Sequence, residues 1–198
     1  MGKDGLRANS VLNEDIVLLL IKKATEFQGA KITGIMGKKA LQKSLYFFNL
    51  KHDIFSFKWG DYGPISAEIQ QIVEDLISSG YVTVTDIDTM KQDAIIKNMK
   101  FSTEKNLYFT ETQFPEEIEK DLDDIVRFIA GRTPRDLELL ASVHFWAVRQ
   151  QDLLDKYTTD YILDKLSELK PDAAFIRKNV EYAIETLESR GYLKAKNS

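Results

Sequence analysis

The sequence predicts a mainly α-helical protein of the α+β class that carries one small antiparallel β-hairpin. Over most of the chain, apolar residues recur at three- and four-residue spacing, which is the period of a half-buried helix. Two short segments alternate at a period of two instead, as strands do. At 198 residues, the chain is long enough for one sizeable domain or two small ones.

The composition is that of a folded globular protein, and it excludes several kinds of site. Hydrophobic residues make up 43% of the chain and charged residues 29%, which is enough apolar material for a core. The absence of cysteine excludes disulfides, thiolate metal sites and a cysteine nucleophile. The apolar run from Ile16 to Ile21 is far too short to span a bilayer, and two lysines follow it. We therefore expect a cytoplasmic protein that does not enter the membrane.

Three helices are expected in the first half of the chain. Residues 14–27 have an amphipathic helical pattern that ends at Gly29, and a second helix follows Gly37. A third begins after Ser66, whose hydroxyl can cap it, and ends at Gly80. The apolar stripe of this third helix consists of Ile69, Ile72, Val73, Leu76 and Ile77.

Short strands are expected on both sides of the third helix. Phe55, Phe57 and Trp59 alternate with polar residues and predict a half-buried strand. Beyond Gly80, residues 81–87 form a second strand.

We expect that strand to pair with residues 106–112 across a long polar loop from Asp88 to Lys105. Three helices followed by two strands is the order of a winged helix-turn-helix. The sequence therefore predicts a winged-helix-like domain over residues 14–113.

Residues 114–195 are expected to form a second, helical domain packed against the first. Pro115, Pro134 and Asp172 stand at the expected starts of three of its helices. The stretches 75–84 and 186–195 are similar, because each has a helix stopped by glycine and followed by tyrosine. Two explanations stay open: a duplicated winged-helix-like unit, or a common stop signal that arose twice.

A basic segment between Ile21 and Gly60 contains eight lysines, although the whole chain has a net charge of −4. Such a segment can attract an acidic partner, or it can be a solvated helix face. The stretch "YGPIS" after it is either a rigid turn that starts a helix or an exposed helix start that holds a partner. The candidate partner-binding residues are Lys38, Lys39, Lys43, Trp59, Tyr62 and Pro64.

No pattern of a catalytic, metal or cofactor site is present. His144 lies on the apolar face of its predicted helix, which is typical of a core histidine, and His52 stands at a helix end, where imidazoles meet the last carbonyls. The acidic run at residues 116–124 points its carboxylates several ways at helical spacing, so we interpret it as a solvated face. We expect no enzyme activity and no cofactor.

Two stretches resemble a known family. "KKALQKSLYFFNLK" and "FKWGDYGPISAEIQQIVEDLISSGYV" are similar to the YwgA-like proteins of bacteria and archaea, and more distantly to the SocA/Panacea antitoxin domains. "LELLASVHFWAVRQ" and "ETLESRGYL" extend the resemblance to about residues 14–193. It implies no activity that can be carried over to this chain. The antitoxin relatives act by binding proteins, either a toxin or a proteolytic machine.

The best-supported function is therefore a non-catalytic protein–protein interaction module of winged-helix type, acting as an antitoxin- or adaptor-like regulator. The loop from Asp88 to Lys105 would offer it an adaptable contact. The alternative is a DNA-binding regulator that uses the lysine-rich segment. Nucleic acid is disfavoured, because the third helix offers Glu68, Glu74 and Asp75. A helix that binds in the major groove of DNA needs basic or amide side chains at such positions. Whether the chain forms a homodimer is left open.

Overall fold

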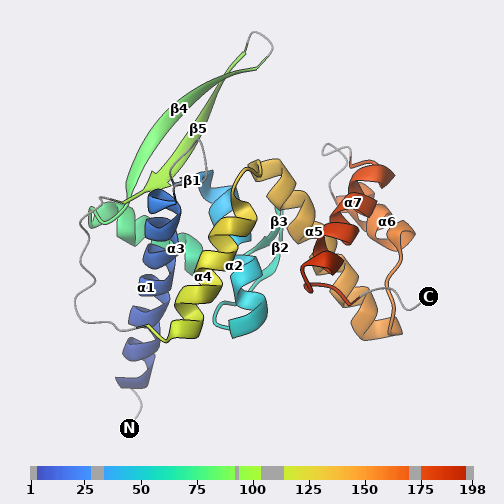
Figure 1. Cartoon of the computed structure of the whole chain (residues 1–198), viewed down its shortest axis with the longest axis horizontal. Coiled ribbons are helices and arrows are strands. Elements are labelled where there is room, and N and C mark those ends of the chain that lie inside the picture. Colours follow the sequence, from blue (N-terminus) through green and yellow to red (C-terminus); the bar gives the residue numbers. More distant parts are fainter. Residues whose placement is uncertain (1–3, 28–33, 92–93, 104–113, 170–174, 195–198) are drawn as a thin grey trace.

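The structure is a computed structural model that describes residues 4–27, 34–91, 94–103, 114–169 and 175–194. Side chains are described for residues 13–27, 34–85, 100–103, 114–169 and 175–194. The molecule is mainly helical with small antiparallel sheets (Figure 1). The predicted fold class is therefore confirmed.

The first half of the chain has the order of a winged helix with an added hairpin. Its elements are α1 (Asp4–Glu26), β1 (Ile35–Met36), α2 (Gly37–His52), β2 (Lys58–Gly60), β3 (Gly63–Ile65), α3 (Ala67–Ser78), β4 (Thr83–Lys91) and β5 (Ala94–Ser102). β1, β5 and β4 form one sheet in that order, and β2 pairs with β3 in a separate two-stranded sheet. The β2–β3 hairpin lies between the second and third helices of the winged-helix order.

The hairpin after α3 differs from the prediction. β5 lies inside the stretch that was expected to be a long loop, and Val84 of β4 pairs with Phe101 of β5. The prediction of a loop from Asp88 to Lys105 is therefore wrong, and the expected strand at residues 106–112 lies outside the described residues. Phe101 is fully buried and anchors β5 in the core. In Figure 1 the two strands project beyond the helices.

The strand expected from Phe55 to Trp59 forms only at its end, in β2. The cause is Asn49 of α2, whose side-chain oxygen accepts hydrogen bonds from the backbone N–H groups of Ile54 and Phe55 at 2.7 and 2.6 Å. Its amide nitrogen also donates to the Phe55 carbonyl at 2.8 Å. Because Asn49 satisfies these backbone groups, the segment has no need of a neighbouring strand.

Helix α3 forms as predicted. The Ser66 hydroxyl accepts a hydrogen bond from the Ile69 backbone N–H at 3.4 Å and caps the helix. Four residues of its apolar stripe are buried: Ile69, Ile72, Val73 and Leu76. The side chains opposite, Glu68, Gln70, Gln71, Glu74 and Asp75, are exposed. The helix stops at Gly80, which has a φ of +80°.

The second half of the chain is helical in the described residues. It consists of α4 (Glu116–Ile129), α5 (Pro134–Leu154), α6 (Thr159–Leu169) and α7 (Arg177–Ser189). α4 packs against α1 and α2, α5 packs against α2 and β3, and α6 and α7 pack against α5 (Figure 1). One cluster of buried side chains runs through both halves. The division at residue 114 stays a prediction.

The two similar stretches share their helix stop. The backbone N–H of Val82 donates to the Leu76 carbonyl, and that of Leu193 donates to the Leu187 carbonyl, in the same way after α3 and α7. Gly191, like Gly80, has a positive φ. The residues described after Gly191 form no strand. The similarity of the described residues is therefore one of helix termination.

Within the described part of the chain, no helix combines the length and apolar character needed to cross a bilayer.

His144 ties α2, α5 and the segment after α7 together. The side chain is buried, and its Nε2 donates to the Tyr192 carbonyl at 3.1 Å, because a carbonyl can only accept. Nδ1 therefore accepts from the Tyr46 hydroxyl, which lies 2.7 Å away. Burial lowers the pKa of His144 to about 4. The imidazole is neutral and fully hydrogen-bonded, as the sequence suggested for a core histidine.

We expect this histidine to make the fold sensitive to acid. The unfolded chain protonates His144 near its ordinary pKa of 6.5, whereas the folded chain does so only near 4. Between these values the unfolded state binds more protons, so the free energy of unfolding falls as the pH falls, by on the order of 3 kcal/mol in total. His144→Gln keeps one donor and one acceptor and cannot titrate. Urea unfolding between pH 7 and 4.5 should therefore show a shallower pH dependence in H144Q than in the wild type. Parallel curves would contradict the assignment.

Candidate functional site

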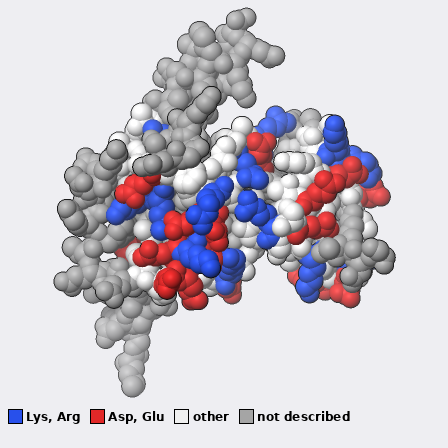
Figure 2. All heavy atoms as spheres, in the orientation of Figure 1, with Lys and Arg blue, Asp and Glu red and all other residues white. Residues whose placement is uncertain are grey.

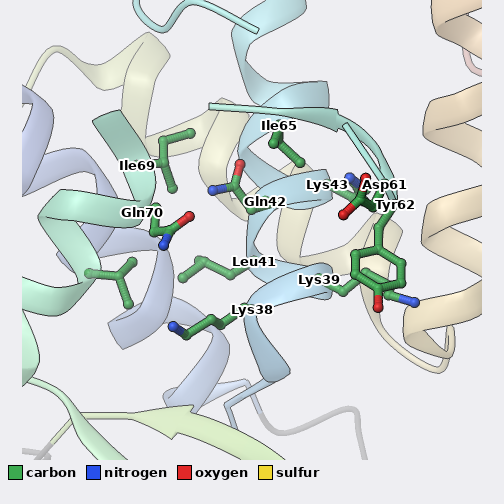
Figure 3. A pocket seen from close by; sticks show the side chains of 11 residues that line it. Lys38, Lys39, Leu41, Gln42, Lys43, Asp61, Tyr62, Ile65, Ile69 and Gln70 are labelled. Carbon is green, nitrogen blue, oxygen red and sulfur yellow. The ribbon is translucent and has the colours of Figure 1, made fainter. Parts of the chain in front are cut away.

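The candidate site is a pocket of about 360 Å³ between α2, α3 and the β2–β3 turn, which we call the α2–α3 pocket (Figure 3). Its apolar lining comes from Leu41, Ile65, Ile69 and Val73. Its polar lining comes from Lys38, Lys39, Gln42, Lys43, Asp61, Tyr62 and Gln70. Apolar walls with a few polar groups at the edge are typical of a binding site.

Two neighbouring side chains of α2 hold the backbone that leads into α3. The Gln42 amide accepts from the Ser66 backbone N–H at 3.0 Å and donates to the Ser66 carbonyl at 2.9 Å. The Lys43 ammonium donates to the Pro64 carbonyl at 2.7 Å. Lys43 is fully buried, so its charge serves this backbone contact and not the surface. The "YGPIS" stretch thus forms a turn whose backbone is held by side chains of α2, which agrees with the interpretation of a rigid turn that starts a helix.

Gly63 allows the turn to approach α5 closely. Its φ is +85°, and a Cβ atom at this position would lie 2.5 Å from the Ser142 hydroxyl oxygen. Only glycine satisfies both the backbone conformation and the space. The packing of β3 on α5 therefore depends on this residue.

Lys39 connects the edge of the pocket to α5. Its ammonium lies 2.7 Å from a carboxylate oxygen of Glu138, whose side chain is buried. It also lies 4.1 Å from the centre of the Tyr62 ring, as Figure 3 shows for the two side chains. Tyr62 itself is 57% exposed. Lys39 thus positions an exposed aromatic ring at the mouth of the pocket.

Lys38 carries the more accessible charge. It pairs with Glu74 of α3 at 3.6 Å, and both side chains are about half exposed. Exposed pairs of this kind contribute little stability and exchange readily with other partners. Lys38 can therefore release Glu74 for an incoming carboxylate.

The structure brings most of the predicted site residues together. Lys38, Lys39, Lys43 and Tyr62 line one pocket, and Pro64 lies behind it as the acceptor for Lys43. Trp59 lies elsewhere: its ring packs 5.4 Å from that of Phe145 and 5.2 Å from that of Trp146 on α5.

Three residues of the site have no sequence signal of their own. Gln42, Gln70 and Glu138 were not predicted. Gln42 and Glu138 act through partners from other elements, the Ser66 backbone and Lys39. Gln70 lines the pocket from α3, where it donates to Glu74 of the same helix.

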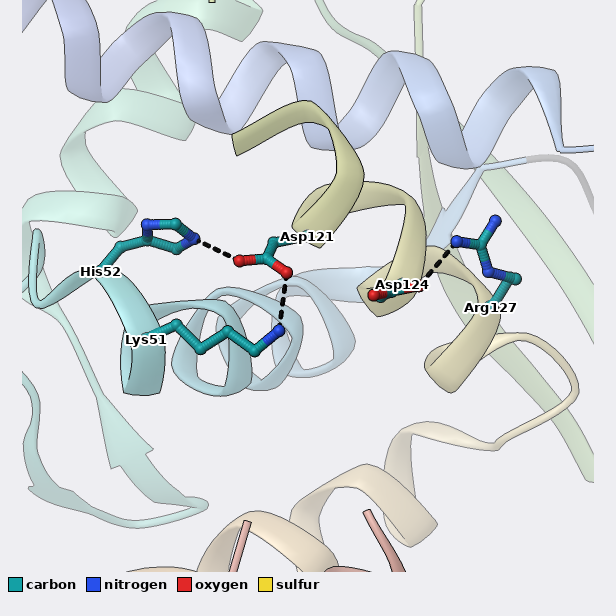
Figure 4. Close-up of polar contacts among 5 residues, drawn as sticks. All are labelled: Lys51, His52, Asp121, Asp124 and Arg127. Atoms are coloured by element: carbon teal, nitrogen blue, oxygen red, sulfur yellow. Dashed lines mark hydrogen bonds and ion pairs between the residues drawn. The ribbon is translucent and has the colours of Figure 1, made fainter. Parts of the chain in front are cut away.

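The acidic face of α4 forms ion pairs with neighbouring side chains (Figure 4). Asp121 lies 2.6 Å from the Lys51 ammonium and 2.9 Å from His52 Nε2. Burial alone would raise the pKa of Asp121, but the hydrogen bonds from Lys51 and His52 hold it below its ordinary value. His52 thus contacts α4 instead of the carbonyls of its own helix. The described residues contain no group of three or more His, Asp or Glu side chains that could hold a metal ion.

Comparison with protein-family models gives no match for this chain, and no curated protein matches it. The resemblance to the YwgA-like and SocA/Panacea groups therefore stays a prediction. The site must be judged on its own geometry.

We expect Gly63→Ala to destabilise the protein more than Gly80→Ala. Both residues have a positive φ, so both substitutions carry a backbone cost of about 1–2 kcal/mol. At Gly80 a Cβ meets nothing within 4 Å, whereas at Gly63 it meets Ser142. Urea unfolding measures the difference. Adding Ser142→Ala should recover part of the loss in G63A and none in G80A; equal losses in the two single variants would refute the close approach.

The Lys39–Glu138 and Lys38–Glu74 ion pairs should also contribute differently to the free energy of unfolding. Lys39→Ala removes a close cation from the buried carboxylate of Glu138 and should cost roughly 1–3 kcal/mol of unfolding free energy. Lys38→Ala breaks an exposed pair and should cost at most about 1 kcal/mol. Chemical denaturation of both variants, with E138A and the K39A/E138A double variant, gives the coupling energy. A coupling energy near zero would contradict the pairing.

Proposed function

We propose that this chain is a non-catalytic module that binds a protein partner through the α2–α3 pocket. The observation that carries the proposal is the pocket itself, with apolar walls, lysines at its edge and an exposed tyrosine beside it. Aromatic anchors next to small apolar pockets are the usual centres of protein interfaces.

The lining indicates what the partner offers. A side chain of the size of leucine or phenylalanine fits the space between Leu41, Ile69 and Val73. A neighbouring carboxylate of the partner would replace Glu74 on Lys38. We therefore propose an acidic segment that carries one bulky apolar residue.

The rigidity of the pocket supports this role. Gln42 and Lys43 fix the start of α3, and Lys39 fixes the Tyr62 ring. A preformed site loses less conformational freedom on binding, so more of the contact energy becomes affinity.

Catalysis and DNA reading are less well supported by the described side chains. The two histidines are engaged elsewhere, His144 in the core and His52 with Asp121. Helix α3 occupies the position of the helix that reads DNA in winged-helix proteins. Its exposed side chains include Glu68, Glu74 and Asp75. Figure 2 shows cations and carboxylates intermixed on the face in view. We further propose a cytoplasmic location, because a chain without cysteine suits a reducing compartment.

Affinity capture from native cells tests the proposal. We compare the wild type with the double variant Lys38→Glu/Tyr62→Ala, which alters two accessible residues of the pocket. The matched control is Lys178→Glu/Tyr182→Ala on α7, where both residues are exposed. We expect a protein partner that stays bound to the wild type in moderate salt and after nuclease treatment. The pocket variant should no longer capture this partner, whereas the control variant should.

The captured partner is then titrated against the purified variants. We expect binding to weaken by roughly tenfold or more in the pocket variant, which is the effect of losing one interface anchor. Equal affinity in both variants, or capture that depends on nucleic acid, would overturn the proposal.

A further inference from the structure

Two arginines share one aromatic ring at a place that the α2–α3 pocket does not include. The guanidinium carbon of Arg132, in the α4–α5 turn, lies 4.4 Å from the centre of the Phe128 ring. That of Arg190, which follows α7, lies 5.3 Å from the same centre. Phe128 itself is fully buried. The fold thus brings two guanidinium groups from distant parts of the chain to one aromatic ring.

Among the described residues, no carboxylate forms an ion pair with either guanidinium, and Arg132 donates instead to the Phe128 carbonyl. The acidic groups nearby have other partners. Asp136 accepts from the backbone N–H and the hydroxyl of Thr133 at 2.9 and 2.7 Å, and Asp124 pairs with Arg127 at 2.6 Å.

The two charges repel each other. Burial lowers the pKa of Arg132, and the charge of Arg190 lowers it further, against weaker opposing effects of Tyr182, Asp136 and Tyr192. Two like charges held near each other without an anion raise the electrostatic energy of the folded state.

A purely structural explanation accounts for one arginine only. A single guanidinium over a ring is stabilised by the cation–π interaction, as Arg149 is over Phe145 at 4.1 Å. The carbonyl ends of α4 and α7 add about half an elementary charge each. These partial charges leave the second guanidinium incompletely compensated.

We propose that Arg132 and Arg190 form a phosphate-binding site at the junction of the α4–α5 turn and the end of α7. A phosphate anion carries the negative charge that the pair still lacks, and its oxygens match the planar fork of each guanidinium. None of these residues lines the α2–α3 pocket, so this site is independent of the function proposed above.

The test is a titration with inorganic phosphate at fixed pH and ionic strength, with chloride as the reference anion. Isothermal calorimetry and thermal unfolding should both show binding to the wild type. Arg190→Gln, at an exposed position, should weaken it by roughly tenfold or more, which corresponds to losing a charge-assisted hydrogen bond. Arg190→Lys keeps the positive charge but loses the planar fork of the guanidinium. Its phosphate affinity should therefore lie between those of the wild type and R190Q.

Arg149→Gln is the matched control, because it removes a stacked arginine whose ring carries no second arginine in the part of the chain that the structure describes. It should bind phosphate as the wild type does. A phosphoserine peptide and its unphosphorylated form distinguish the sources: preferential binding of the phosphorylated form indicates a modified partner, and binding of phosphate alone indicates the free ion.

The stability of Arg190→Gln in chloride separates a binding role from a structural one. If the pair awaits an anion, removing one cation leaves the melting temperature unchanged or raises it. Three outcomes would overturn the proposal. R190Q could melt at a lower temperature and keep its phosphate affinity, the wild type could fail to bind phosphate, or R149Q could lose as much phosphate affinity as R190Q.

Discussion

The contact of α2 with the backbone from Pro64 to Ser66 determines the geometry of the site. Gln42 hydrogen-bonds with both backbone groups of Ser66, and the buried Lys43 ammonium donates to the Pro64 carbonyl. Ser66 in turn caps α3. The distance between the two helices, and with it the width of the pocket, is therefore set by polar contacts that apolar side chains cannot replace without leaving buried backbone groups unsatisfied.

The turn held by this contact has two different faces. Gly63 has a left-handed backbone and lies against Ser142, while Tyr62 points outward over Lys39. One face of the turn is thus committed to packing on α5, and the other remains available at the surface. A rigid interior contact with an accessible aromatic side chain is a favourable arrangement for recognition, since the ring loses little freedom on binding.

Local patterns predicted what local interactions determine. The stripe, cap and glycine stop of α3 all lie within one helix, and the sequence was sufficient to find them. β5 was missed because Lys97, Asn98 and Lys100 give it the composition of a loop, whereas its stability comes from pairing with β4 and from Phe101. The burial of Lys43 and the pairing of His52 depend on acceptors 21 and 69 positions away. Such partners are fixed by the tertiary fold, so no pattern along the chain reveals them.

The hydrogen-bonded series from Tyr46 through His144 to Tyr192 has a consequence for biosynthesis. Its two steps join residues 98 and 48 positions apart, so α2 meets its last partner only after nearly all of the chain described here has left the ribosome. Until then the rings of Phe47 and Phe128 lack the contact that Tyr192 makes with both in the finished protein. This aromatic cluster is therefore complete only once the segment after α7 has been synthesised.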